Sequence, residues 1–166
     1  MYSIIKDFVE DWKEESASTI KILSQVPDKD KSVKVNENIR SLERLAWHIT
    51  QSLTEMPKSA GITDEDPLEN MNIPGSFSEI VKLYKKYSDN LMEVLPKTWK
   101  DEDLFKDLKI YGQVWQGRKV LSALVKHQVH HRAQMTVLMR LQNLGVPGVY
   151  GPSREEWSQY GMEAQE

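Results

Sequence analysis

The 166-residue chain is predicted to be all-α, a four-helix bundle followed by a short C-terminal helix. Four segments carry apolar residues three and four positions apart, the spacing that places them on one face of a helix. Prolines, glycines and capping motifs stand at the ends of these segments, where helices begin and end. Four amphipathic helices in a chain of this length pack as one bundle, so we expect a single domain over residues 1–166.

The first two predicted helices each end at a proline. The first covers about residues 2–26, before Pro27, and the second covers about residues 41–56, before Pro57. Proline interrupts a helix because it lacks an N–H and its ring clashes with the preceding turn. The residues expected in the core recur at the helical spacing and are Ile5, Phe8, Trp12, Ile20 and Leu23, then Leu42, Leu45, Ile49, Leu53 and Met56.

The third predicted helix begins at a capping box formed by Ser76 and Glu79 and ends at Pro96. Its apolar side consists of Ile80, Leu83, Tyr84, Tyr87, Leu91 and Leu95. Residues 108–115 then alternate weakly between apolar and polar types, which is typical of a short extended arm or a hairpin.

The fourth predicted helix covers about residues 118–144 and has the clearest signals. Gly145 is expected to be its C-cap, and Pro147 follows just beyond. Further along, Ser153 and Glu156 form a second capping box, which predicts the short C-terminal helix.

The composition excludes several classes of function. Lys plus Arg is 22 and Asp plus Glu is 25, and this balance gives no reason to expect a nucleic-acid partner. Cysteine is absent, so any thiol chemistry needs a thiol supplied from outside the chain. No stretch approaches the ~18 consecutive apolar residues of a membrane span, and no signal-peptide core is found. We therefore expect no membrane partner and a cytoplasmic location.

Three of the four histidines, His127, His130 and His131, stand close together in the fourth predicted helix. At about 100° per residue, His127 and His131 lie about 40° apart, and we expect both in the middle of the core-facing stripe. An unpaired buried polar group costs about 1–3 kcal/mol. A metal ion satisfies both rings together, because the i, i+4 spacing places them side by side and neutral imidazole is a common ligand.

His48 is the remaining histidine that could supply a third ligand. It lies at the edge of the second helix's apolar stripe, a position that also suits a surface residue. His130 projects away from the pair, so we expect it beside the ligands and not among them. Gln134 faces inward and could hydrogen-bond a ligating imidazole or a bound water, although a hydrogen bond to backbone at a helix interface is an equal alternative.

Residues 127–135, with the sequence HQVHHRAQM, resemble the H-x-x-H-H-R-x-Q signature of the DinB/YfiT-like superfamily of metal-binding bundles. The segment around His48 resembles that family's second-helix histidine segment, and residues 115–118 and 144–151 are also similar. The resemblance implies an up-down-down-up bundle, often in a homodimer, with His48, His127 and His131 as metal ligands. It implies nickel or zinc, with iron, cobalt or manganese as alternatives.

A site of three histidines without a fourth protein ligand is open and can activate a bound water or an external thiol. Some relatives transfer a low-molecular-weight thiol, such as bacillithiol or mycothiol, to electrophiles. The resemblance therefore favours a metal-dependent thiol S-transferase that acts on a small-molecule substrate. A metal-dependent hydrolase, a bundle that binds a metal or small ligand without catalysis, and interface histidines without a metal are the alternatives.

Several aromatic residues could serve the site or an interface. Trp115, Tyr150 and Trp157 flank the fourth helix and could border the mouth of the site. Trp47 is expected to be exposed, and it could serve the homodimer interface that the resemblance implies.

Overall fold

The computed structural model describes residues 1–164, and four long helices dominate it. They are α1 (Ile5–Leu23), α2 (Leu42–Ser59), α3 (Phe77–Thr98) and α4 (Gly117–Leu141). The shorter elements are the 3₁₀ helix η1 (Asp101–Phe105), the strands β1 (Asp107–Ile110) and β2 (Gln113–Gln116), and the 3₁₀ helix η2 (Trp157–Tyr160). The predicted helical bundle is confirmed.

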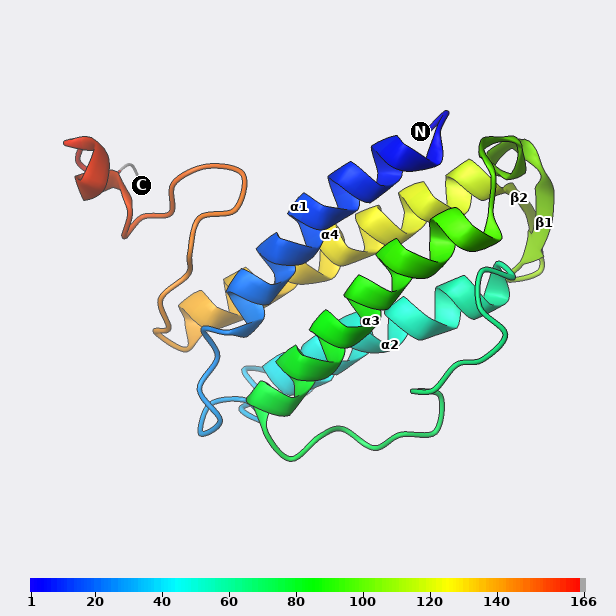
Figure 1. Cartoon of the computed structure of the whole chain (residues 1–166). Helices are drawn as coiled ribbons and strands as arrows, with labels where there is room; N and C mark the ends of the chain where they lie inside the picture. Colours follow the sequence, from blue (N-terminus) through cyan, green and yellow to red (C-terminus); the bar gives the residue numbers. More distant parts are fainter. Residues whose placement is uncertain (165–166) are drawn as a thin grey trace.

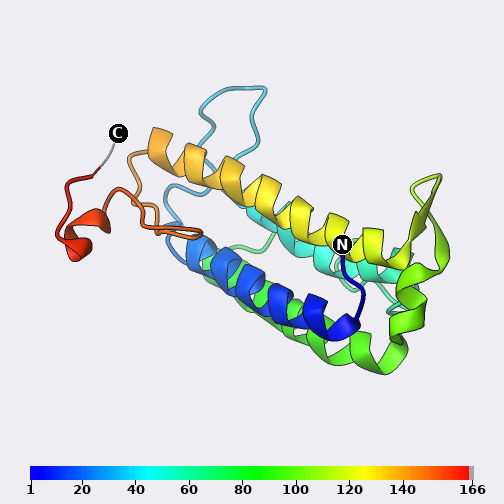
Figure 2. The same cartoon turned by 90° about the horizontal axis from the view of Figure 1, so that it is seen from above.

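The four helices run up, down, down and up (Figure 1). α1 and α4 point in one direction, and α2 and α3 point in the other. α1 and α2 each pack against both α3 and α4, so that α1 and α2 lie diagonally across the bundle. Figure 2 shows α2 with α4 on one side and α1 with α3 on the other. This arrangement places α4, which carries three histidines, beside α2, which carries the fourth.

The core lies where the apolar faces of the four helices meet. Most of the predicted core residues are buried there, and Phe8, Trp12 and Ile49 have no exposed surface. Trp47 is also buried, with 1% of its surface exposed, so the expectation of an exposed interface tryptophan is wrong. The reason is that α2 packs against two helices, α3 and α4, which widens its buried face beyond the narrow apolar stripe.

Two prolines lie inside the helices that they are predicted to end. α2 continues past Pro57 to Ser59, and α3 continues past Pro96 to Thr98. Both prolines stand in the last turn, with only two helical residues after each, so each helix still ends close to its proline. The carbonyl of Pro57 accepts a hydrogen bond from the backbone N–H of Ile62 at 2.9 Å, which satisfies one carbonyl at this helix end.

α4 ends at Leu141, three residues before the predicted end, and Gly145 is not its C-cap. Asn143 takes the left-handed conformation instead, with φ of 57°. The N–H of Leu144 donates to the carbonyl of Met139 at 2.8 Å, and the N–H of Asn143 donates to that of Arg140 at 3.0 Å. This is a Schellman motif, and asparagine fits it because it tolerates the left-handed region better than other non-glycine residues.

The predicted extended arm is the antiparallel hairpin of β1 and β2, in which Leu108 lies opposite Trp115. Tyr111 and Gly112 form its two-residue turn with φ of 52° and 72°, which is the backbone of a type I′ turn. The hydroxyl of Tyr111 donates to the carboxylate of Glu55 on α2, so the hairpin is fixed near the C-terminal end of α2.

The predicted C-terminal helix is the single 3₁₀ turn η2. The carboxylate of Glu156, the second member of the predicted capping box, accepts a hydrogen bond from the N–H of Ser153 at 3.2 Å. The tail that carries η2 lies at the end of the bundle opposite to the hairpin (Figure 1). Over the described residues, no helix has the length and apolar character needed to cross a membrane.

Candidate metal centre

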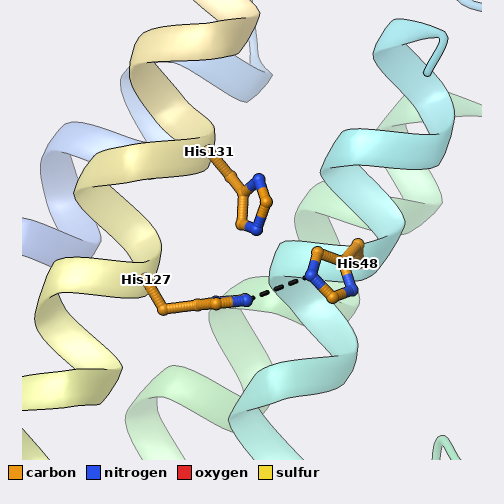
Figure 3. Close-up of side chains that lie close together, drawn as sticks. All are labelled: His48, His127 and His131. Carbon is orange, nitrogen blue, oxygen red and sulfur yellow. Dashed lines mark hydrogen bonds between the residues drawn. The ribbon is translucent and has the colours of Figure 1, made fainter. Parts of the chain in front are cut away.

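Three histidine side chains point toward one another across the contact between α2 and α4 (Figure 3). The ring centroids of His127 and His131 are 4.5 Å apart, as the i, i+4 spacing requires. The ring of His48 lies 4.8 Å from that of His127 and 4.6 Å from that of His131. The packing of the two helices therefore supplies the third member of the group, which we call the triad.

The nitrogens of the triad lie close enough together to be candidate ligands of one metal ion. One ring nitrogen from each histidine can be chosen so that all three lie within 4.8 Å of one another. The Nε2 atoms of His48 and His127 are 3.0 Å apart. Two nitrogens bound to one ion at about 2.0–2.1 Å are separated by about 3 Å when they occupy neighbouring positions. The triad could therefore hold a metal ion.

The surroundings of the triad keep its imidazoles neutral at pH 7. Partial burial, followed by the nearby His131, Arg40 and Arg44, lowers the pKa of His48 to about 4. Partial burial and the neighbouring histidines lower the pKa of His127 to about 4 as well. The pKa of His131 is also lowered, chiefly by burial. Neutral imidazole is the form that binds a metal, and the proton shared between the two Nε2 atoms of His48 and His127 would have to move when both nitrogens ligate an ion.

Gln134 and His130 lie beside the triad on α4, and both are exposed, so the expectation that Gln134 faces inward is wrong. The side-chain oxygen of Gln134 is 2.8 Å from Nδ1 of His131, so it accepts a hydrogen bond from Nδ1–H and leaves the lone pair on Nε2. Its amide nitrogen donates to Nε2 of the exposed His130 at 3.1 Å. His130 thus lies outside the triad. Its ring meets the His131 ring edge to face, and Gln134 bridges the two residues.

The histidines do not occupy the middle of α4's buried face, where the helical spacing predicts them. His127 and His131 are only half-buried, whereas Leu124, Gln128 and Met135 are fully buried. α4 contacts both α1 and α2, so its buried face extends over polar positions that an apolar pattern does not reveal. The triad consequently lies at an edge of the α2–α4 contact, where small molecules can reach it.

Gln128 joins α4 to two neighbouring helices next to the triad. Its amide nitrogen donates to Oγ of Ser52 on α2 at 2.9 Å, and its oxygen accepts from the hydroxyl of Tyr84 on α3 at 3.0 Å. All of these side chains are buried. The network fixes the position of α4 against α2, and with it the separation of His48 and His127.

Arg132 joins α4 to α1 and to the C-terminal tail. It is 2% exposed, and its guanidinium forms an ion pair with Glu15 at 2.6 Å. The hydroxyl of Tyr150 donates to the same carboxylate at 2.8 Å. Tyr150, which could have bordered the site, therefore packs on the Arg132–Glu15 pair. Sequence patterns give no sign of this pair, because its members are 117 positions apart.

A cavity of about 550 Å³ lies beside the triad, with His48 and His127 in its wall. Its other lining residues are Gln51, Ser52, Glu55, Met56, Asp66, Glu69, Tyr111, Trp115 and Ala123. Trp115 thus borders the cavity, whereas Trp157 stands on η2 and does not line it. Gln51 and Glu55 follow His48 by three and seven positions, a spacing on one helix face that could have identified them from the sequence.

The chain is similar to known proteins over almost its whole length. The sequence model of the DinB family matches residues 1–165. The protein YrdA of Bacillus subtilis (strain 168), described as uncharacterized, is 33% identical over 164 residues, which span 99% of this chain and 98% of YrdA.

Solved structures show the same similarity. A DinB-like protein from Bacillus cereus matches with a TM-score of 0.83 and 35% identity, over 90% of this chain and 100% of that one. The DinB-like protein YjoA from Bacillus subtilis matches with a TM-score of 0.67 and 19% identity, over 84% of this chain and 96% of that one. The second similarity concerns the fold alone.

Proposed function

This chain belongs to the DinB family, and we propose that it is a metal-dependent enzyme that transfers a low-molecular-weight thiol to an electrophilic small molecule. One observation carries the proposal: the three imidazoles converge beside a cavity of about 550 Å³. An ion held by the triad would be next to a space of the size that small-molecule ligands occupy.

His48, His127 and His131 would hold the ion. Nitrogen ligands and family membership favour nickel or zinc, with iron, cobalt or manganese as alternatives. Among the described residues, no further histidine or carboxylate joins the group, so positions on the ion remain for water or substrate. A divalent ion held there would supply the Lewis acidity that makes water or a thiol nucleophilic at neutral pH.

The side chains around the triad would prepare it for this role. Gln134 holds His131 in the tautomer whose Nε2 is free to bind, and Gln128 keeps α4 at a fixed distance from α2. The chain contains no cysteine, so the attacking sulfur must come from the second substrate. That sulfur would bond to the electrophilic carbon, the leaving group would depart with its electron pair, and the thiol proton would pass to solvent.

The test combines metal analysis with an assay. Protein purified without a histidine tag is examined by elemental analysis, and turnover of 1-chloro-2,4-dinitrobenzene is measured with cysteine, bacillithiol or mycothiol. We expect a metal in the wild type, loss of both metal and turnover in His127→Ala, and retention of both in His130→Ala. Full metal content and unchanged turnover in His127→Ala would contradict the proposal. Metal binding without turnover of any pair would identify a non-catalytic bundle instead.

A further inference from the structure

The cavity beside the triad is lined by carboxylates and contains no lysine or arginine among its described lining residues. Glu55 comes from α2, and Asp66 and Glu69 come from the loop that follows α2. Low-dielectric walls with charge of one sign concentrate ions of the opposite sign. The lining therefore favours a ligand with positive charge.

One of the three carboxylates is already neutralised. Glu69 forms an ion pair with Lys58 at 3.3 Å, and both side chains are largely exposed. The pair therefore contributes little net charge to the cavity.

The other two carboxylates have only neutral donors as partners. Both oxygens of Glu55 lie 2.8 Å from the hydroxyl of Tyr111. Asp66 accepts hydrogen bonds from the hydroxyl of Thr54 at 2.5 Å and from the N–H of Leu68 at 3.2 Å. No lysine or arginine in the described part of the chain forms an ion pair with Glu55 or Asp66. Two negative charges are thus held in position and remain without a cation.

Aromatic rings complete this side of the cavity. The rings of Tyr111 and Trp115 meet edge to face, with centroids 5.8 Å apart. The ammonium of Lys119, which does not line the cavity, lies 4.3 Å from the Trp115 ring centroid. The chain's own ammonium therefore already occupies one face of the Trp115 ring, and Tyr111 and Trp115 serve as apolar wall on this side of the cavity.

The opposite side of the triad has the opposite charge. A smaller cavity of about 230 Å³ lies next to His131 and is lined by Arg40, Asn38 and Gln134 among others. An anionic group would be drawn to this second cavity. The larger cavity is therefore the part of the site that selects a cation.

We propose that the small molecule bound in the larger cavity carries a protonated amine or a quaternary ammonium group. Glu55 and Asp66 attract the cation, and the rest of the molecule extends past the Trp115 wall toward His48 and His127. The inference deepens the proposed function, because it names the substrate class for the same site. Its test does not depend on a bound metal or on turnover.

The test uses three probes of similar shape and different charge. Choline is cationic, 3,3-dimethyl-1-butanol is its neutral counterpart, and 3,3-dimethylbutanoate is anionic. Their dissociation constants are measured by calorimetry on the full chain, as purified and after treatment with a chelator. We expect choline to bind about tenfold more tightly than the neutral alcohol, and the anion to bind most weakly, in both preparations.

Charge-removing variants identify the residues that carry the effect. In Glu55→Gln/Asp66→Asn the preference for choline should fall to about twofold or less, because the amides keep the shape and remove the charge. Glu93→Gln, on the exposed face of α3, is the matched control and should keep the preference. Circular dichroism verifies that each variant is folded.

Equal affinity for choline and the neutral alcohol, tighter binding of the anion, or absence of binding by all three probes would overturn the inference. An undiminished preference in the folded double variant would overturn it too. The metal content of the same preparations is measured separately. A protein that contains no metal as purified and binds no added nickel or zinc, yet prefers choline, would contradict the proposed function and leave the inference intact.

Discussion

The Nε2 atoms of His48 and His127 lie 3.0 Å apart, although the two residues are separated by 79 positions in the chain. Their contact exists only when α2 and α4 are packed against each other, so an ion bound to both rings would bind the folded state alone. Metal binding and folding stability should therefore be linked.

The first prediction is that metal raises the melting temperature. An ion at a concentration about 100 times its Kd adds about 2.7 kcal/mol to the free energy of unfolding. For a domain of this size that corresponds to about 5–11 °C. Melting curves with nickel or zinc, and with a chelator, measure the shift. It should disappear in His48→Ala and His127→Ala and persist in His130→Ala. An equal shift in all four proteins would show that the ion binds elsewhere.

The second prediction concerns the metal-free protein in acid. The unfolded chain takes up protons at its histidines near pH 6.5, whereas the pKa values of folded His48 and His127 are about 4. Between these values the unfolded state binds more protons, so the free energy of unfolding should fall as the pH decreases from 6.5 toward 4. Urea unfolding at pH 7, 6 and 5 measures the slope. His48→Gln/His127→Gln should flatten it, and an unchanged slope in this variant would exclude these two groups.

The third prediction concerns Gln134, whose oxygen holds Nδ1–H of His131. Removal of such a partner typically lowers metal affinity about 10–100-fold, because the ring loses its preferred tautomer and orientation. Chelator competition should show this loss in Gln134→Ala. Lys126→Ala, a change on the same helix away from the triad, serves as the control and should keep the wild-type affinity. Equal affinities in the two variants would mean that Gln134 does not support the site.

The helices could be predicted from the sequence because their apolar spacing is a local property. Their ends were less predictable, because tertiary contacts decide whether the chain continues past a proline. Pro57, for example, is buried within α2, and its carbonyl is satisfied by the loop that follows. Asn143, and not Gly145, takes the left-handed conformation. Both residue types suit a helix end, so the sequence alone does not rank the two positions.

The candidate site was predictable to a different extent for each residue. Helical spacing brings His127 and His131 together, whereas His48 required a family resemblance or the demand for a third ligand. Asp66 lies in a loop without periodicity, so no pattern places it beside the triad. Gln128 was missed for another reason: a polar residue in a buried position contradicts the apolar pattern on which the prediction depends.

The last prediction concerns the buried ion pair of Arg132 and Glu15, which ties α4 to α1. Arg132→Met should lower the free energy of unfolding by about 3–5 kcal/mol, because it leaves the Glu15 carboxylate buried without its cation. The double variant Arg132→Met/Glu15→Met should lose less, since neither charge then remains unpaired. Urea unfolding of the three proteins measures both effects.

Metal binding provides the control for this prediction. The pair contacts none of the three triad histidines, so the folded variants should still bind nickel or zinc with the wild-type stoichiometry. If the double variant is less stable than Arg132→Met, the free energy of unfolding depends on Glu15 even without its cation. The loss in Arg132→Met would then not come from an unpaired buried charge. In that case the bond from the Tyr150 hydroxyl to Glu15 would be the next contact to remove, by Tyr150→Phe, because it fastens the tail to the same carboxylate.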